Sequence, residues 1–167
     1  MSAEHPIVKT EAPGLSDEEF LRQFEACTFP YVHWTHLAHL RVAYCYITRL
    51  GLEAAIAKVT AGIRAYNRSQ GIVDTPTSGY HETMTVAWLR IMAAMLAEYG
   101  PTGAVSSDSP PLLGPDAPPS QEFLAAQPQL REKKLLRLYY TRARFLSPEA
   151  KYAFVDPEIA PLPGIRN

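Results

Sequence analysis

Three of the five histidines of this chain fall in one short stretch, Tyr-Val-His-Trp-Thr-His-Leu-Ala-His-Leu. They are His33, His36 and His39, spaced three residues apart. A neutral imidazole is the commonest nitrogen ligand for metals and a frequent proton acceptor in catalysis. A fourth histidine, His81, is followed directly by Glu82 at the start of another apolar segment. These two stretches are therefore the first places to look for chemistry.

Helical periodicity puts His36 and His39 on one face of a helix predicted over residues 34–50. Successive residues are about 100° apart around a helix, so side chains at positions i and i+3 lie one turn apart and can approach a common point. Both histidines fall on the predicted buried stripe of this helix. The side chains predicted to lie opposite that stripe are Arg41, Cys45, Thr48 and Arg49. His33 joins the pair only if the helix begins earlier, which the proline of Phe29-Pro30 disfavours.

His81 falls in the middle of the apolar stripe of a second helix, predicted over residues 80–99. Thr85 lies one turn further along the same face, and Glu82 falls on the shoulder of the stripe. The stripe also contains Trp88 and the methionines Met84, Met92 and Met95. Thr83 and Arg90 are predicted to point away from it. The sequence thus predicts three inward histidines and a nearby carboxylate on two helices.

A metal ion is one way to satisfy such a cluster, because helix bundles build metal sites from inward-facing His and Glu side chains. In this interpretation His36, His39 and His81 are the ligands. Glu82 is a fourth ligand, or a catalytic base that takes a proton from metal-bound water. The donor set suits a divalent zinc, nickel, iron or manganese ion, acting in hydrolysis or oxidation of a small molecule. His81 and Glu82 diverge by about 100°, so both reach one ion only if the helix start is bent.

A non-enzymatic binding module is the alternative hypothesis. The histidines then form a buried hydrogen-bond network with tyrosine, glutamate or backbone partners. An apolar pocket formed by Trp34, Trp88 and the methionines holds a small ligand without metal. Tyr66 and Asn67, near the end of a third helix, are further candidates for ligand contacts. A third hypothesis is an interaction or scaffold protein that uses the proline-rich segment 101–119 as its contact surface.

Bulk composition excludes several other classes. The 167 residues suffice for one domain with a core. A formal net charge of -1 argues against a nucleic-acid partner, because such proteins usually carry a basic excess. No apolar run approaches membrane-spanning length, and the N-terminal residues lack the features of a secretory signal. A cytoplasmic protein without a membrane partner is therefore expected. The two cysteines, Cys27 and Cys45, have no metal-finger spacing and are expected to be free thiols that are buried or half-buried.

The predicted fold class is all-α, a single-domain helical bundle of three to four main helices plus short C-terminal helices. Residues 1–15 are predicted to form a flexible tail and residues 16–163 the domain. The main helices are predicted over about 16–26, where Ser16 and Glu19 form a capping box, 34–50, which ends at Gly51, 52–68 and 80–99. Six prolines between residues 101 and 119 indicate an irregular surface excursion. Shorter helices are predicted to begin at Ser120, Pro128 and Ser147-Pro148.

Three motifs of the chain resemble those of a family of small uncharacterised bacterial proteins. They are Trp-Thr-His-Leu-Ala-His-Leu over residues 34–40, Ala-Tyr-Asn over 65–67 and Gly-Tyr-His-Glu-Thr over 79–83. The dipeptides Phe123-Leu124 and Leu162-Pro163 fit the same resemblance, which covers about residues 16–163. The resemblance implies a domain boundary and implies no activity.

Overall fold

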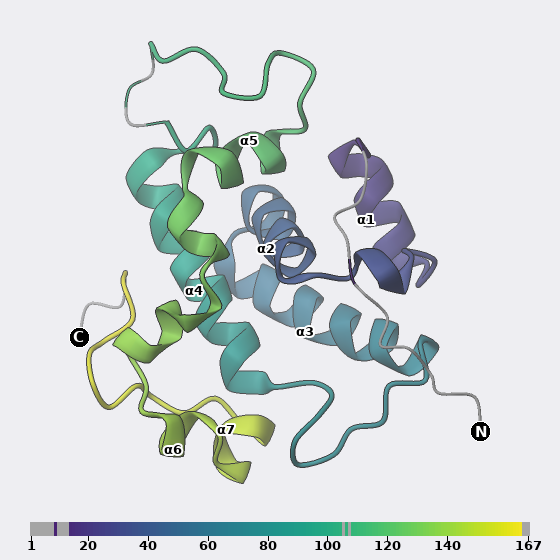
Figure 1. Ribbon diagram of the computed structural model, residues 1–167, viewed down its shortest axis with the longest axis vertical. Helices are drawn as coiled ribbons and strands as arrows, with labels where there is room; N and C mark the ends of the chain where they lie inside the picture. Colours follow the sequence, from purple (N-terminus) through teal and green to yellow (C-terminus); the bar gives the residue numbers. More distant parts are fainter. Residues whose placement is uncertain (1–8, 10–13, 105, 107, 165–167) are drawn as a thin grey trace.

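The computed structural model describes residues 9, 14–104, 106 and 108–164, and its regular structure in that part of the chain is helical (Figure 1). The four longer helices are α1 (Asp17–Glu25), α2 (His36–Leu50), α3 (Leu52–Ser69) and α4 (Glu82–Tyr99). No strand occurs among the described residues, so the predicted all-α class is confirmed. None of the helices in this part of the chain has the length and apolar character needed to span a bilayer.

Helix α1 begins where the sequence predicts, because the Ser16 hydroxyl accepts a hydrogen bond from the Glu19 amide at 3.2 Å. The second half of the predicted capping box does not form. The Glu19 carboxylate turns along the helix and binds the side chains of Arg22 and Gln23. The apolar face of α1 is buried through Phe20 and Phe24, and this face anchors α1 to the core.

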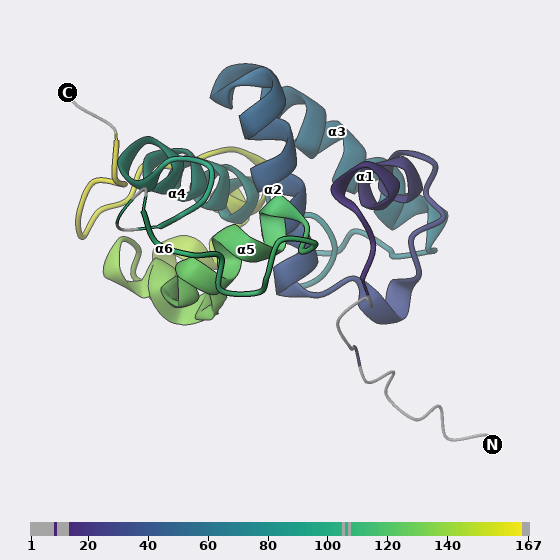
Figure 2. The same cartoon turned by 90° about the horizontal axis from the view of Figure 1, so that it is seen from above.

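Helix α2 begins at His36, two residues later than predicted. The Thr35 hydroxyl caps it by accepting from the Ala38 amide at 3.3 Å, and a separate 3-10 turn, η1 (Tyr31–His33), precedes it. Arg41 and Cys45, which are predicted to lie opposite the histidine stripe, are also buried: they are only 4% and 1% exposed. Helix α2 contacts α1, α3, α4 and α5, and therefore has several covered faces (Figures 1 and 2).

Gly51 ends α2 with a positive φ of 80°, and α3 starts at the next residue. A glycine adopts this backbone conformation without the steric cost that a Cβ atom brings. The short link leaves α2 and α3 in contact, and α4 packs against both. These three helices form the framework that carries the histidines.

Helix α4 begins at Glu82, with His81 as its N-cap residue. Burial around this helix differs from what the predicted stripe suggests at two residues. Thr83, predicted to point away, is fully buried, and its hydroxyl donates to the Ala153 carbonyl at 3.0 Å. Met84, predicted on the apolar stripe, is 41% exposed. The C-terminal helix α7 (Pro148–Tyr152) packs on α4, so this face of the first turn is covered by a segment far away in the sequence.

Residues 101–118 carry no regular helix or strand where they are described, and they extend away from the helices at the top of Figure 1. Helix α5 (Pro119–Ala126) follows. Ser120 does not cap it as predicted. Its hydroxyl is buried against Asp17 at 2.5 Å and against Arg41 at 2.9 Å.

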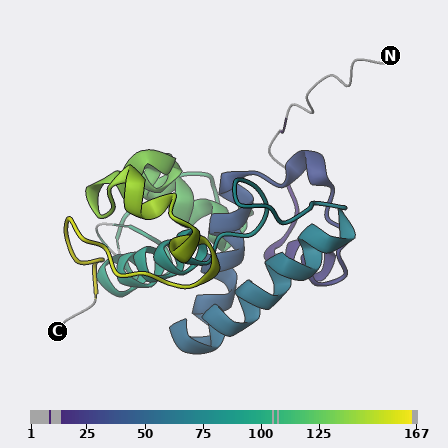
Figure 3. The same cartoon turned by 90° about the horizontal axis from the view of Figure 1, so that it is seen from below.

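The chain then covers one side of α4 with four short segments (Figure 3). They are the 3-10 helices η2 (Pro128–Arg131) and η3 (Lys133–Leu138) and the helices α6 (Arg142–Phe145) and α7. The predicted start at Pro128 gives 3-10 turns in place of an α-helix. The predicted start at Ser147-Pro148 is confirmed, with the Ser147 hydroxyl accepting from the Ala150 amide.

Candidate functional site

His36 is held by a carbonyl group from the other end of the chain. Its Nε2 lies 2.9 Å from the Leu130 carbonyl oxygen, and its ring packs edge-on against Trp88 at 4.8 Å between centroids. A carbonyl oxygen only accepts, so Nε2 carries the proton and donates. In neutral His36 the remaining nitrogen, Nδ1, is an acceptor, and no described residue donates a hydrogen bond to it.

His39 is fixed by its own helix start. Its Nδ1 donates to the Thr35 carbonyl at 2.7 Å, and its ring lies 4.0 Å from the Trp34 ring between centroids. The same argument leaves Nε2 as the acceptor nitrogen of neutral His39. Burial is the main cause that lowers the pKa of His39 to about 4; the nearby His36, Lys9 and Lys133 act in the same direction, and the bond to the Thr35 carbonyl acts against them. The ring is therefore neutral at physiological pH.

His81 uses both of its ring nitrogens within the fold. Nε2 donates to the Phe145 carbonyl at 2.9 Å, and Nδ1 accepts from the Met84 amide at 3.0 Å as the cap of α4. The ring also stacks on Phe145 at 4.7 Å. Neither nitrogen has a lone pair for a metal ion unless the helix cap breaks. His81 therefore acts in this structure as a helix cap and a link to α6.

Glu82 lies beside His81, and its carboxylate accepts from the Tyr80 hydroxyl at 2.6 Å and pairs with Arg64 at 3.5 Å. It is absent from the walls of both cavities described below. Glu82 thus links the loop before α4 to α3, and its catalytic role stays a prediction.

In the described part of the chain, no three His, Cys, Asp or Glu side chains lie close enough together to hold a metal ion. The structure therefore shows no ligand set for the predicted metal centre there. His36 and His39 lie near each other, but His81 is engaged elsewhere. A zinc, nickel, iron or manganese site stays a prediction, and the geometry gives it no support.

A cavity of about 570 Å³ opens beside His36 and His39. Helix α2, helix α3, helix α4 and the segment from η3 to α6 all contribute to its wall. The apolar part of the wall comprises Trp34, Leu40, Ala43, Val59, Ile63, Met84, Trp88, Leu89, Leu136, Phe145 and Leu146. This volume and lining are typical of sites for small organic molecules.

The histidines supply hydrogen-bonding groups in this otherwise apolar wall. Burial lowers the pKa of His36 and the Leu130 carbonyl raises it again in part, while Lys133 lowers it and Glu132 raises it. Both rings are thus neutral, and each has one acceptor nitrogen that no described residue satisfies. A ligand hydroxyl or N–H group can donate to them.

The residues predicted for ligand binding separate into two groups. Trp88 lines the cavity. Tyr66 is completely buried, with its hydroxyl donating to the Phe29 carbonyl at 2.7 Å, and half-buried Asn67 is in neither cavity wall. His33 lies on η1 and lines a second, smaller cavity of about 270 Å³.

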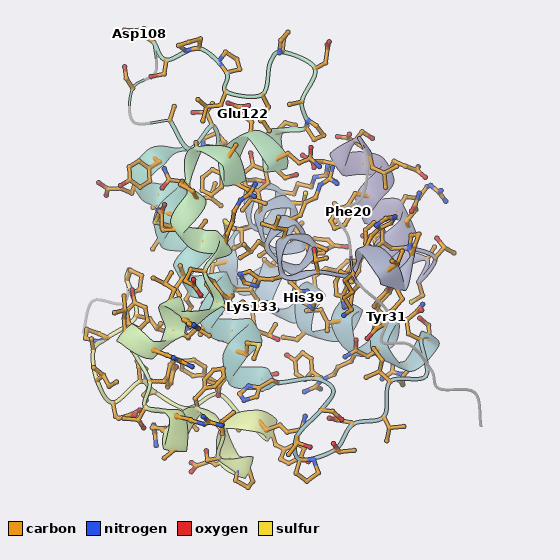
Figure 4. The ribbon with its side chains drawn as sticks, viewed as in Figure 1. Phe20, Tyr31, His39, Asp108, Glu122 and Lys133 are labelled. Atoms are coloured by element: carbon orange, nitrogen blue, oxygen red, sulfur yellow. The ribbon has the colours of Figure 1, made fainter. Side chains whose placement is uncertain are left out.

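The basic side chains of the cavity were not among the predicted site residues. Lys133, Lys134, Arg137 and Arg142 line its outer part and are exposed. Figure 4 shows Lys133 and His39, which share this cavity, near the centre of the molecule. The signal available in the sequence was the basic run between residues 131 and 142, but only the fold places that run over the start of α2.

Comparisons of the chain with protein-family models, with curated proteins and with solved structures found no match. The resemblance to a family of small bacterial proteins therefore stays an expectation, and the case for function depends on the cavity alone.

Proposed function

We propose that this protein binds a small organic molecule, without a metal ion, in the cavity between α2, α4 and the segment from η3 to α6. The observation that carries the proposal is the wall of that cavity. Two neutral imidazoles with unsatisfied acceptor nitrogens stand among two indoles and a set of aliphatic side chains. An apolar enclosure with a few convergent polar groups favours a small ligand.

The way the histidines are held supports binding over metal catalysis. The Thr35 carbonyl holds the His39 ring, and the Leu130 carbonyl holds the His36 ring. These bonds fix which nitrogen is the donor, so each ring presents a defined acceptor to a ligand. Pre-oriented groups of this kind lower the entropic cost of binding and select ligands with a matching donor.

Tryptophan emission gives a direct assay, because both tryptophans of the chain line the cavity. Decanol and decanoate are titrated by fluorescence, and naphthol and naphthoate by calorimetry. We expect saturable one-to-one binding by at least one of them and a rise in melting temperature, because a ligand that binds only the folded state stabilises it.

A variant that fills the cavity locates the ligand. Thr85 lines the cavity and its hydroxyl bonds back to the His81 carbonyl. Thr85→Phe should weaken binding about tenfold or more, since the new ring occupies ligand space. Thr60→Phe on α3 is the matched control, because Thr60 also bonds back to its own helix but lies outside both cavity walls. Ala43→Leu is a second filling variant, and circular dichroism checks that each variant folds.

Three results would contradict the proposal. The first is that no probe binds. The second is that the probes bind equally well to Thr85→Phe, Ala43→Leu and Thr60→Phe. The third is that binding disappears with a chelator and returns with zinc, nickel, iron or manganese. The last result would favour the metal hypothesis, and elemental analysis of protein purified without a histidine tag would then identify the ion.

A further inference from the structure

The charged side chains in the wall of the cavity are basic, although the Glu132 carboxylate lies near enough to act on His36. Five basic residues line it, namely Lys9, Lys133, Lys134, Arg137 and Arg142, and none of the described residues in its wall is acidic. The chain as a whole has a formal net charge of -1. The basic lining is thus a local concentration of charge, not a consequence of composition.

Four of these cations are not neutralised within the described part of the fold. Lys133, Lys134, Arg137 and Arg142 make no ion pair with any described carboxylate. They contrast with Arg41, Arg49, Arg64, Arg144 and Lys151, each of which has an acidic partner. Because the four are exposed while they line the cavity, they lie where it opens to solvent.

One part of the cavity is therefore apolar and the other is positively charged. Its inner part carries Trp34 and Trp88 and the aliphatic side chains of α2, α3 and α4, and the four cations come from residues 133–142. The electrostatic effect of Lys133 reaches inward, since it lowers the pKa values of both His36 and His39 after the larger effect of burial. A positive potential inside a low-dielectric cleft attracts anions and raises their local concentration.

We infer that the ligand is an organic acid anion: an apolar alkyl or aromatic body with a carboxylate or similar acidic group. The body lies against the two indoles, and the acidic group lies at the mouth, within reach of Arg137, Arg142 and Lys133. Guanidinium groups match a carboxylate well because they can donate two parallel hydrogen bonds. This inference depends on the proposed function, since it names the class of molecule that the same cavity binds.

Matched ligand pairs test the charge separately from the apolar body. Decanoate is compared with decanol and decylammonium, and naphthoate with naphthol, by calorimetry at low and high salt. We expect each carboxylate to bind about tenfold more tightly than its alcohol at low salt, and this advantage to shrink as salt screens the charges. Decylammonium should bind most weakly of the decyl probes.

Two double variants locate the charge. Lys133→Ala/Arg137→Ala should weaken decanoate binding about tenfold and leave decanol binding within about twofold. Lys58→Ala/Arg68→Ala removes the same net charge from exposed positions of α3 that line neither cavity, and it should change neither affinity. Both variants replace exposed side chains, so the fold should tolerate them, and melting curves check this.

The outcomes separate the two proposals. If carboxylates and alcohols bind equally, or if the two double variants behave alike, the acid-anion inference is wrong while a binding cavity remains. If no probe binds the wild-type protein, both proposals are wrong. Adsorption to phosphatidylglycerol vesicles without any response to free decanoate or naphthoate also overturns the inference, because the basic residues would then serve a membrane surface.

Discussion

Acidification should destabilise this protein through His39, and the size of the effect follows from its pKa. The ordinary histidine pKa of about 6.5 applies to the unfolded chain, whereas burial lowers the pKa of His39 in the fold to about 4. Between these two values the unfolded state binds more protons than the folded state. The contribution of neutral His39 is therefore fully present above pH of about 6.5, and it is lost as the pH falls towards about 4.

The linkage relation gives the magnitude. Between pH 7 and pH 5, a group with these two pKa values reduces the free energy of unfolding by about 2 kcal/mol. This is an upper value, because His39 is half-buried and not completely buried. Carboxylates contribute less over this range, since their ordinary pKa values lie near 4. The window from pH 7 to pH 5 therefore reports mainly on histidines.

The assay compares wild-type protein with His39→Asn by urea unfolding at several pH values. Asparagine keeps a donor near the position of Nδ1, so the bond to the Thr35 carbonyl can survive, while the titrating group is removed. The variant should lose about 2 kcal/mol less than the wild type between pH 7 and pH 5. Parallel stability curves, or a His39 ring that titrates near 6.5 by NMR, would refute the argument.

Two buried charges outside the cavity give further predictions. Asp17→Ala leaves the buried guanidinium of Arg41 without its carboxylate partner at 3.0 Å, so the free energy of unfolding should fall by about 3 to 5 kcal/mol in urea titrations; a loss under 1 kcal/mol would show that the pair is not buried as described. Lys151→Met removes the Nζ donor that binds Asp74 at 2.7 Å and two carbonyls of the loop before α4. It should cost about 2 kcal/mol and speed amide exchange in residues 71–79, and unchanged exchange there would contradict the assigned role.

Local sequence signals predicted the element boundaries well where a single turn decides the outcome. Ser16 caps α1, Gly51 ends α2 and Ser147 caps α7. A cap or a breaker acts on backbone groups within three or four residues, so the sequence contains all the information needed. The α-helix predicted to begin at Pro128 is a 3-10 helix in the structure. A proline at the first position is compatible with either type, so it does not decide between them.

Side-chain burial was predicted less well, because periodicity shows which residues share a face and not how many faces are covered. Arg41 lies away from the histidines, yet it is buried because α1 and α5 supply Asp17 and Ser120 to bind it. Thr83 is buried for the same kind of reason, through Ala153. Both partners are distant in sequence, so no local pattern indicates them.

The candidate site shows the same difference between local patterns and contacts that are distant in sequence. Periodicity predicted His36 and His39 on one buried face; both line the cavity, and both are half-buried. Four of the five basic residues of the cavity lie about a hundred positions further along the chain, on short 3-10 and helical turns that have no strong periodicity. Only the path of the chain back across α2 and α4 brings Lys133 near His39 (Figure 4).

The fold also explains why clustered histidines need not imply a metal. Carbonyl groups at the ends of short helices lack partners within their own helix, and a buried carbonyl must find a donor. Leu130, near the end of η2, and Phe145, at the end of α6, supply such carbonyls, and His36 and His81 donate to them. Each imidazole thus ties a C-terminal turn to a long helix. His81 is consumed entirely by this structural role, since its second nitrogen caps α4. The second nitrogen of His36, Nδ1, caps no helix, so this histidine can position the C-terminal segment and still offer an acceptor to a ligand.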